Sequence, residues 1–367
     1  MKFIRLIHFY AFAAIISSIR AAPPSRLDCE VKGKYNPKTT IEKLATCKTL
    51  VFQDVQLSSN QQLNLTNLNG ITIEFNGNIT FAVRHDRIKL MHITGTQLNI
   101  TASPSAWFIA FGEKYYDGGG YYTGQIKPMF AMIEVTNSRL TGLKALGTPA
   151  HAFMLAECHN SKFINFEVDD SAGDKNHLAK NTDGIHILQS SNITITGAII
   201  HVQDDCVCIT SGYDVNITNI TCTGGGFSTG SIGKNRINTV ERVTFSASTI
   251  TRSLYGLLIK IWPNTKGTVD RVTFENIALK DVKQQGIAIT KGYTFKGLYS
   301  KPTTGVTITN LVIRNISGNV EDKGQSVMIN CPRGECGNFT WKNVKILGGK
   351  ATLMKSSLAL TEAQYTH

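Results

Sequence analysis

A short β-type segment recurs along this 367-residue chain at a long and steady interval. Each copy alternates β-branched or aromatic side chains with polar ones and ends in Gly, Asn, Ser or Asp. The copies open at Asn192, Asn216, Arg242, Arg271, Gly305 and Asn338, and their starts differ by 24, 26, 29, 34 and 33 residues. Strands of a sandwich would recur about every ten residues, whereas this longer period indicates a solenoid with about three strands per coil. The sequence therefore predicts an all-β, single-domain parallel β-helix.

The ends of such a solenoid need covering, because an open sheet edge pairs with other chains. Residues 29–50, with Cys29 and Cys47, are predicted to form the N-terminal cap, and the tail from Ala351 is expected to cover the other end. No boundary divides the chain between residues 23 and 367, so one domain is expected there. Asn at corresponding turn positions predicts left-handed backbone geometry and ladders of Asn side chains.

The first 22 residues have the pattern of a secretory signal peptide. Lys2 and Arg5 give a basic start, His8 to Ile19 is largely apolar, and small residues follow. The apolar run is too short to span a bilayer, and no later segment is long enough either. The sequence therefore predicts a secreted, extracellular protein with a signal peptide at 1–22 and a mature domain at 23–367. Eight N-x-[ST] sequons agree with secretion, although those embedded in coils are expected to serve the repeat instead: Asn64, Asn78, Asn99, Asn192, Asn216, Asn219, Asn315 and Asn338.

Eight cysteines in a secreted chain fit disulfides. We predict three bridges: Cys29–Cys47 across the cap, Cys206–Cys222 across one coil, and Cys331–Cys336 around a short C-terminal loop. Cys158 and Cys208 are left over, either as a fourth pair or as buried thiols. No CxxC-type spacing indicates a metal site.

The formal charge of +12, with a pI near 9.3, favours a polyanionic partner. No run of Lys and Arg and no RNA-binding signature accompanies this charge, so we expect neither nucleic-acid nor membrane partners. An acidic polysaccharide is the remaining class of ligand that this charge favours.

Three aspartates form the clearest candidate site. Asp183 lies in a turn-like Asn-Thr-Asp-Gly motif, which by itself is ordinary turn chemistry, whereas Asp204 and Asp205 interrupt an apolar coil. Adjacent carboxylates are costly to bury, so such a pair is kept where its charge is used. Asp183 and Asp204 are close to one coil apart and can project from the same face. Crowded carboxylates raise one another's pKa, which allows one to act as a general acid and another as a base.

Other residues near this motif have both structural and functional interpretations. The run Gly224 to Gly226 is either a turn or a place where backbone approaches a sugar. Lys260 falls at the same stage of the repeat as the aspartates and can reach an anionic ligand. The tyrosine-rich segment 115–122 is expected to be an exposed loop that stacks on sugars or packs on the solenoid. Three histidines near the acidic motifs are interpreted as structural: His177, His186 and His201.

Taken together and in order, these motifs resemble the polygalacturonases of glycoside hydrolase family 28, from Cys29 to about Trp341. The resemblance rests on Asp117-Gly118, Lys127-Pro128, Asn181-Thr182-Asp183-Gly184, Gln203-Asp204-Asp205-Cys206, Gly230-Ser231-Ile232-Gly233, Gly256 to Lys260, and Tyr293. It implies a right-handed parallel β-helix, and inverting hydrolysis of α-1,4-linked polygalacturonate by a monomer without metal or cofactor.

The resemblance also implies roles for individual residues. Asp204 would be the general acid, while Asp183 and Asp205 would hold and deprotonate the attacking water. Lys260 and Tyr293 would bind substrate, and Asn181 would support the site.

This sequence departs from the family pattern at two important positions. Gly225 or Gly226 stands where the family has histidine, and Leu258 stands where it has arginine; His186 also replaces a usual Asp. Acid–base tuning is typically worth about 10²–10⁴-fold in rate, and leucine cannot grip a carboxylate as arginine does. We therefore expect a pectin-binding protein whose hydrolytic activity is lost or strongly reduced. The alternatives are an active hydrolase of homogalacturonan or modified pectin, and a purely structural solenoid.

Overall fold

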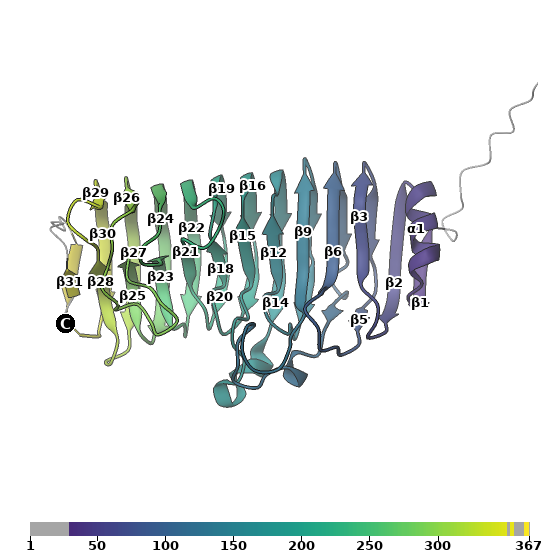
Figure 1. The fold of residues 1–367 in the computed structure, drawn as a ribbon, viewed down its shortest axis with the longest axis horizontal. Coiled ribbons are helices and arrows are strands. Elements are labelled where there is room, and N and C mark those ends of the chain that lie inside the picture. The colour runs from purple at the N-terminus through teal and green to yellow at the C-terminus, as the bar shows by residue number, and fades with distance from the viewer. Residues whose placement is uncertain (1–28, 351–352, 356–362, 367) are drawn as a thin grey trace, which may run out of the picture.

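The computed structural model describes residues 29–350, 353–355 and 363–366, so the predicted signal peptide lies outside the described residues. Its described part is a continuous stack of coils whose strands all pair in parallel, apart from one isolated antiparallel bridge in a loop. Figure 1 shows the coils following one another from the N-terminal cap to the C-terminal end. The predicted single-domain parallel β-helix is confirmed.

The strands are short, as the repeat predicted. In the first coils they are β1 (Glu30–Lys34), β2 (Thr49–Leu57), β3 (Leu63–Asn69), β4 (Thr72–Phe75), β5 (Ile79–Phe81), β6 (Lys89–Thr96), β7 (Asn99–Ala102), β8 (Phe108–Ile109), β9 (Met129–Thr136), β10 (Arg139–Thr141) and β11 (Lys144–Leu146). In the middle they are β12 (Phe153–Ala156), β13 (His159–Ile164), β14 (Glu167–Asp169), β15 (Ile185–Leu188), β16 (Ser190–Thr196), β17 (Ile199–His201), β18 (Val207–Ile209), β19 (Gly212–Thr218), β20 (Thr221–Thr223), β21 (Phe227–Ile232) and β22 (Thr239–Thr251). The last are β23 (Tyr255–Ile261), β24 (Gly267–Val282), β25 (Gln285–Thr290), β26 (Val306–Thr309), β27 (Val312–Val320), β28 (Gln325–Asn330), β29 (Cys336–Gly337), β30 (Thr340–Leu347), β31 (Leu353–Lys355) and β32 (Ala363–Thr366).

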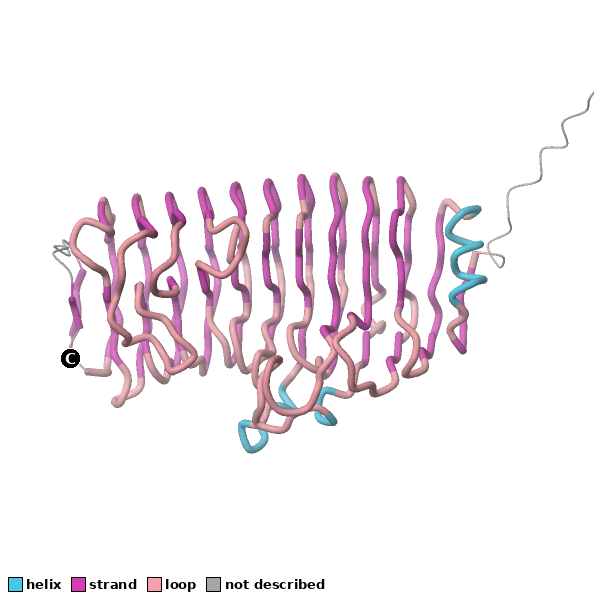
Figure 2. Tube along the Cα trace, in the orientation of Figure 1, coloured by secondary structure: helices cyan, strands magenta, loops and turns pink. Residues whose placement is uncertain are grey.

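The N-terminal cap contains an α-helix that the sequence reading did not predict. Helix α1 (Pro37–Thr46) begins after Asn36, whose side chain accepts hydrogen bonds from the backbone N–H groups of Lys38 and Thr39. Proline suits the first helical position because its fixed φ fits a helix and its missing N–H would be unpaired there. The Cys29–Cys47 disulfide closes the segment around this helix. Figure 2 shows α1 lying across the end of the stack.

The core lies inside the coils, where every second side chain of each strand points. Aromatic rings stack from coil to coil: Phe227 lies 5.4 Å from Phe245, which lies 5.0 Å from Phe274. All three are fully or almost fully buried. Burial of each such side chain contributes about 1.5–3 kcal/mol, so successive coils stabilise each other through contacts that the repeat itself sets up.

The turns confirm the prediction about asparagine. Asn192, Asn276 and Asn315 all have φ near +50°. Their side-chain amides form ladders: Asn192 donates to Asn160 at 2.8 Å, and Asn315 donates to Asn276 at 2.8 Å. Two of the sequons therefore serve the turn structure, as the sequence interpretation proposed.

All three predicted disulfides are present, since Cys206–Cys222 and Cys331–Cys336 join the bridge in the cap. The sequence left the state of Cys158 and Cys208 open. In the structure they are two separate buried thiols. Within the described residues, no helix is long and apolar enough to cross a membrane.

Two loops near the middle of the solenoid project from one edge of the stack. One leads from β8 to β9 and contains the short helix η1 (Gly112–Lys114), and the other leads from β14 to β15 and contains η2 (Ser171–His177). Figure 2 shows both short helices in this projection. The β14–β15 loop itself contains Asn181 and Asp183, and the β8–β9 loop contacts it through the hydrogen bond from the backbone N–H of Tyr121 to Asn181 Oδ1.

Candidate active site

Asp183 and Asp205 lie on successive coils, immediately before strands β15 and β18. The backbone N–H of Ala152 donates to the carbonyl of Asp183 at 2.8 Å, and that of Gly184 donates to the carbonyl of Asp205 at 2.9 Å. In a parallel ladder this places His151, Asp183 and Asp205 at the same level of three neighbouring coils. One oxygen atom of the Asp183 carboxylate lies within 4.8 Å of one oxygen atom of the Asp205 carboxylate. The one-coil spacing thus brings their side chains onto one face.

These residues line a cavity of about 480 Å³. The predicted site residues that line it are Asn181, Asp183, Asp204, Asp205, Lys260 and Tyr293. A second hollow of about 210 Å³ is lined by Asp204, Asp205, Lys260 and Tyr293 as well, so the two are continuous. The hollow surface therefore extends across several coils, as a site for a chain-like ligand does.

Asp205 and Lys260 form a buried ion pair. Lys260 Nζ donates to Asp205 Oδ2 at 2.8 Å, and the two residues are only 8% and 6% exposed. Burial disfavours the lysine charge, but Asp205 and Asp204 outweigh it and raise the pKa of Lys260 well above its usual range. Burial raises the pKa of Asp205 to about 7 even though Lys260 lowers it. The positive charge of Lys260 is therefore already paired with Asp205 and is only partly free to bind a ligand.

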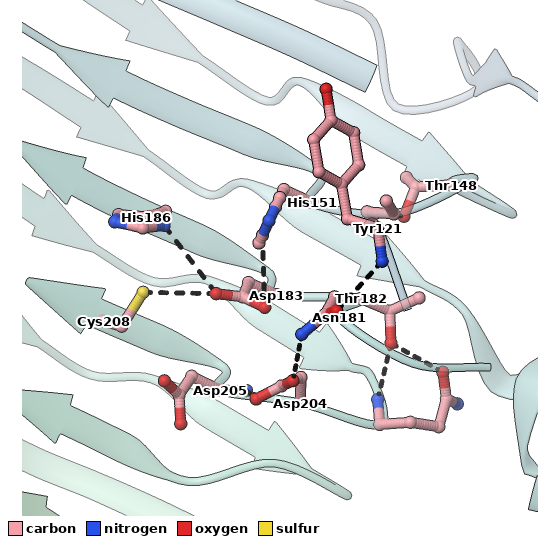
Figure 3. A network of polar contacts seen from close by, with 12 residues as sticks. Tyr121, Thr148, His151, Asn181, Thr182, Asp183, His186, Asp204, Asp205 and Cys208 are labelled. Carbon is pink, nitrogen blue, oxygen red and sulfur yellow. Dashed lines mark hydrogen bonds and ion pairs between the residues drawn. The ribbon is translucent and has the colours of Figure 1, made fainter. Parts of the chain in front are cut away.

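Two histidines contact Asp183. His151 Nδ1 lies 3.2 Å from Asp183 Oδ1, and His186 Nδ1 lies 3.8 Å from Oδ2. Figure 3 shows the two rings approaching the carboxylate from different sides. Burial opposes ionisation of Asp183, but His151, His186 and Lys260 outweigh it and hold its pKa well below the usual range. Burial also opposes the charge on His151, yet Asp183 raises its pKa, so these two residues form an ion pair.

Asp204 has different partners. Its Oδ2 accepts a hydrogen bond from Asn181 Nδ2 at 3.2 Å, and its Oδ1 accepts one from the backbone N–H of Asp205 at 2.9 Å. Burial raises the pKa of Asp204, and the charge of Asp183 raises it further. Asp204 and Asp183 thus differ in protonation behaviour, which is the arrangement that acid–base chemistry requires.

Asn181 joins Asp204 to the loop between β8 and β9. Its φ is +53°, and its Oδ1 accepts a hydrogen bond from the backbone N–H of Tyr121 at 3.0 Å. The loop itself is fixed by Lys127, which is fully buried and bonds Asp117 at 2.8 Å. This ion pair gives the Asp117 and Lys127 motifs a positioning role behind the cavity.

The tyrosine-rich segment is only partly the exposed loop that the sequence suggested. Tyr122 is 77% exposed and lines the cavity, whereas Tyr115 is fully buried. The hydroxyl of Tyr115 accepts a hydrogen bond from the backbone N–H of Arg84 at 3.0 Å. Tyr115 therefore anchors the loop, and Tyr122 is the tyrosine positioned to meet a ligand.

Gly225 and Gly226, where the motif resemblance predicts a missing histidine, are tightly packed. A Cβ on Gly225 would lie 1.8 Å from the carbonyl oxygen of Asp204, and one on Gly226 would lie 2.1 Å from that of Tyr255. Both atoms belong to the backbone of neighbouring coils, so they cannot move aside cheaply. Neither position accommodates a histidine in this backbone, so the absence of that side chain is built into the coil packing.

Leu258, where the motif resemblance predicts a missing arginine, is buried in a small apolar cluster. It packs with Ala288, Leu298 and Met328, and Tyr255 and Tyr293 lie against the cluster. Leu258 also lines the second hollow beside Lys260. Leu258 thus contributes an apolar side chain to a hollow that Asp204, Asp205 and Lys260 line as well.

Sequence reasoning missed His151, because the residue lies 32 positions before Asp183 and belongs to no acidic motif. The register would have revealed it, since Phe153 pairs with Ile185 and thereby aligns His151 with Asp183. His186 was interpreted as structural, yet it also lies in the cavity. His201 lies elsewhere and pairs with Asp174 at 2.8 Å.

The comparison with known families agrees with this architecture. A family model described as glycosyl hydrolases family 28 matches residues 47–363. The chain belongs to this family. A polygalacturonase of Cochliobolus carbonum is 36% identical over 348 residues, which cover 93% of this chain and 95% of the relative. Endopolygalacturonase I of Aspergillus aculeatus is 35% identical over 327 residues, covering 88% and 86% respectively.

Solved structures show the same relationship. Endopolygalacturonase I from Stereum purpureum, complexed with two galacturonate, superposes with a TM-score of 0.81 at 27% identity, covering 92% of this chain and 98% of that one. A polygalacturonase from Erwinia carotovora ssp. carotovora superposes with a TM-score of 0.66 at 16% identity, covering 95% and 98%, and supports the fold alone. The family 28 resemblance inferred from the motifs is confirmed, and this chain is a polygalacturonase-like protein.

Proposed function

We propose that this family 28 protein is a secreted monomer that binds homogalacturonan in its groove and hydrolyses it far more slowly than a complete family site would. The observation that carries this proposal is the cavity in which three carboxylates meet one lysine, with Leu258 lining the adjoining hollow. The net charge of +12 favours an acidic polysaccharide as the ligand.

Each site residue has a proposed role. Asp204 is the general acid, supported by its raised pKa and its bond to Asn181. Asp183 and Asp205 hold the attacking water. This role is supported by their proximity, because one oxygen atom of each carboxylate lies within 4.8 Å of one oxygen atom of the other. Lys260 and Tyr293 bind the substrate around the scissile bond, since both line the cavity.

The expected rate is low for two physical reasons. No histidine stands at Gly225 or Gly226 to tune the acid, and such tuning is typically worth about 10²–10⁴-fold. Leu258 cannot form the two parallel hydrogen bonds by which arginine holds a carboxylate. The charge of Lys260 is shared with Asp205, so it compensates only in part.

The test compares binding and turnover on polygalacturonate. We expect retention on a polygalacturonate matrix at low salt, with reducing-sugar release about 10²–10⁴-fold below that of a family endopolygalacturonase. Asp204→Asn should abolish whatever release remains. Leu258→Arg should strengthen binding and raise the rate, while the size-matched Leu258→Met should not. A wild-type rate equal to that of an active relative would overturn the proposal, and so would failure to bind the matrix.

A second candidate is an active hydrolase of modified pectin, which the surroundings of Leu258 favour. Tyr255 and Tyr293 pack against the apolar cluster of Leu258. Such a wall suits a galacturonosyl unit whose carboxylate is esterified, because an ester carries no charge that needs arginine. Faster release from highly methyl-esterified pectin than from its de-esterified form, reversed by Leu258→Arg, would select this candidate.

A further inference from the structure

His151, Asp183 and His186 form a cluster whose geometry goes beyond general acid–base chemistry. The Nδ1 atoms of both histidines are buried, and neither forms a hydrogen bond that meets normal geometry. One ligand atom from each of the three residues lies within 4.8 Å of the other two. Figure 3 shows His151 approaching the Asp183 carboxylate from the neighbouring coil and His186 approaching it from the same coil.

The tautomer of His186 is linked to the hydrogen bond between its Nε2 atom and Thr210. His186 Nε2 lies 3.1 Å from Thr210 Oγ1, and the single proton of that hydroxyl has the carbonyl oxygen of Ile187 as an acceptor at 3.4 Å. In the tautomer that carries its proton on Nε2, His186 donates to Thr210 and the lone pair of Nδ1 faces the Asp183 carboxylate. A cation between these two acceptors stabilises that tautomer.

This arrangement matches what is found around metal-bound histidines. There, one ring nitrogen binds the metal, and the other donates to an oxygen that fixes the ring and its tautomer. Thr210 provides that oxygen for His186. In tetrahedral zinc sites with bonds near 2.0–2.1 Å, ligand atoms lie about 3.3 Å apart. The observed separations of 3.2 and 3.8 Å are within a small side-chain adjustment of this value.

We propose that His151, Asp183 and His186 bind one divalent cation of the zinc class, with its remaining coordination position toward the cavity. Imidazole nitrogen is preferred by zinc, copper and nickel, whereas magnesium and calcium prefer oxygen alone.

Binding of such a cation has a direct consequence for the groove. The cation displaces the proton that His151 holds against Asp183, because a metal ligand must be deprotonated. It also occupies the carboxylate to which the proposed function assigns the attacking water. The site thus provides reversible inhibition by zinc, although the metal binding itself does not depend on any hydrolytic activity.

The first test titrates the full-length mature protein with Zn²⁺ by calorimetry, and with Co²⁺ by visible absorption. We expect one equivalent of each to bind, and neither Ca²⁺ nor Mg²⁺ to compete. His186→Gln should abolish the cobalt spectrum, and Thr210→Val should weaken zinc binding by about 10–100-fold by removing the outer oxygen. His201→Gln is the matched control, since that histidine pairs with Asp174 outside the cavity, and it should bind zinc as the wild type does.

A thermal melt without metal establishes that each variant is folded before titration. Absence of stoichiometric Zn²⁺ binding to the wild type would overturn the proposal. Equal losses in His186→Gln and His201→Gln would do so as well, because zinc would then bind unspecifically. These readouts use no substrate, so a failure of the proposed function would leave them unchanged.

Discussion

Two buried aspartates, Asp170 and Asp183, meet opposite surroundings in this fold. Asp183 is 6% exposed and is surrounded by His151, His186 and Lys260. Asp170 is fully buried, its side-chain hydrogen bonds come from uncharged groups, and the nearby charge of Asp169 has the same sign as its own. Burial raises the pKa of Asp170 to about 7, whereas the cationic neighbours of Asp183 hold its pKa well below the usual range. Burial sets the cost of a charge, but the partners decide whether the charge is kept.

The hydrogen bonds around Asp170 agree with a neutral carboxyl group. The backbone N–H of Thr148 donates to Asp170 Oδ1 at 2.5 Å, while the Thr148 hydroxyl lies 2.6 Å from Oδ2 and 2.8 Å from the carbonyl oxygen of Ala150. One hydroxyl proton cannot serve both acceptors. If it goes to Ala150, Asp170 must itself donate to Thr148. Below its pKa of about 7, Asp170 holds a proton that Asp183 releases at much lower pH.

The largest expected effect comes from removing the cation of the charged cluster. Lys260→Met should lower the free energy of unfolding by about 3–5 kcal/mol, because it leaves Asp205 buried without its partner. Denaturant unfolding of the wild type, Lys260→Met, Asp205→Asn and the double variant measures this in one cycle. If the losses of the two single variants simply add up in the double variant, the ion pair is not what holds the two side chains in place.

The next effect tests the neutral state of Asp170 by its pH dependence. Its pKa in the folded state is about 7, against a usual value of 3.8, so the folded protein holds a proton that the unfolded chain releases between these pH values. Stability from this group is complete below pH 3.8 and falls by about 1.4 kcal/mol per pH unit until pH 7.

Asp170→Asn should remove that part of the slope, as measured by unfolding at several pH values. The titratable groups that face Asp170 are Tyr116 and Asp169. Burial raises the pKa of Tyr116 far above this window, so it stays protonated throughout. Asp169→Asn is the control and should retain the slope. An unchanged slope in Asp170→Asn would show that Asp170 is ionised like Asp183.

A smaller effect is expected when the partner of Asp170 is removed instead. Thr148→Val deletes the hydroxyl while keeping the shape, which leaves one oxygen of Asp170 without a partner. The expected loss in unfolding free energy is about 1–3 kcal/mol. If Thr148→Val were as stable as the wild type in denaturant, that hydroxyl would not be what stabilises the buried acid.

The smallest effect is expected at Asp174. This residue lies on the β14–β15 loop, as Asp170 does, but its carboxylate is largely exposed. It pairs with His201 at 2.8 Å, and its side chain is 54% exposed. His201→Gln should therefore change stability by less than about 1 kcal/mol, because water screens exposed pairs. A larger loss of stability in a thermal melt would mean that burial does not explain why ion pairs of these carboxylates differ in strength.

The fold was predictable because each coil repeats the same local chemistry. The fold depends on local patterns that can be recognised without knowledge of distant contacts. These patterns are alternating β-branched residues, Asn in left-handed turns and paired cysteines. Helix α1 was missed because it occurs once, in the cap, and belongs to no repeat. The site was predictable only where residues lie in recognisable motifs, such as Asp183, Asp204, Asp205 and Lys260.

His151 and the packing at Gly225 and Gly226 could not be read from motifs, because both depend on which coil lies beside which. A restored histidine looks simple in the sequence, but in the fold its Cβ would meet the backbone of the neighbouring coil.

By itself, the sequence determined the parallel β-helix, the family and the one-coil spacing that places the aspartates on one face. Only the tertiary structure decided their charge states, since these depend on burial and on partners such as His151 and Lys260 that come from other coils. It also decided that the pKa of Asp170 is raised while that of Asp183 is lowered. The physical reason is that a repeat fixes the positions of backbone segments, whereas the energy of a buried charge depends on every side chain around it.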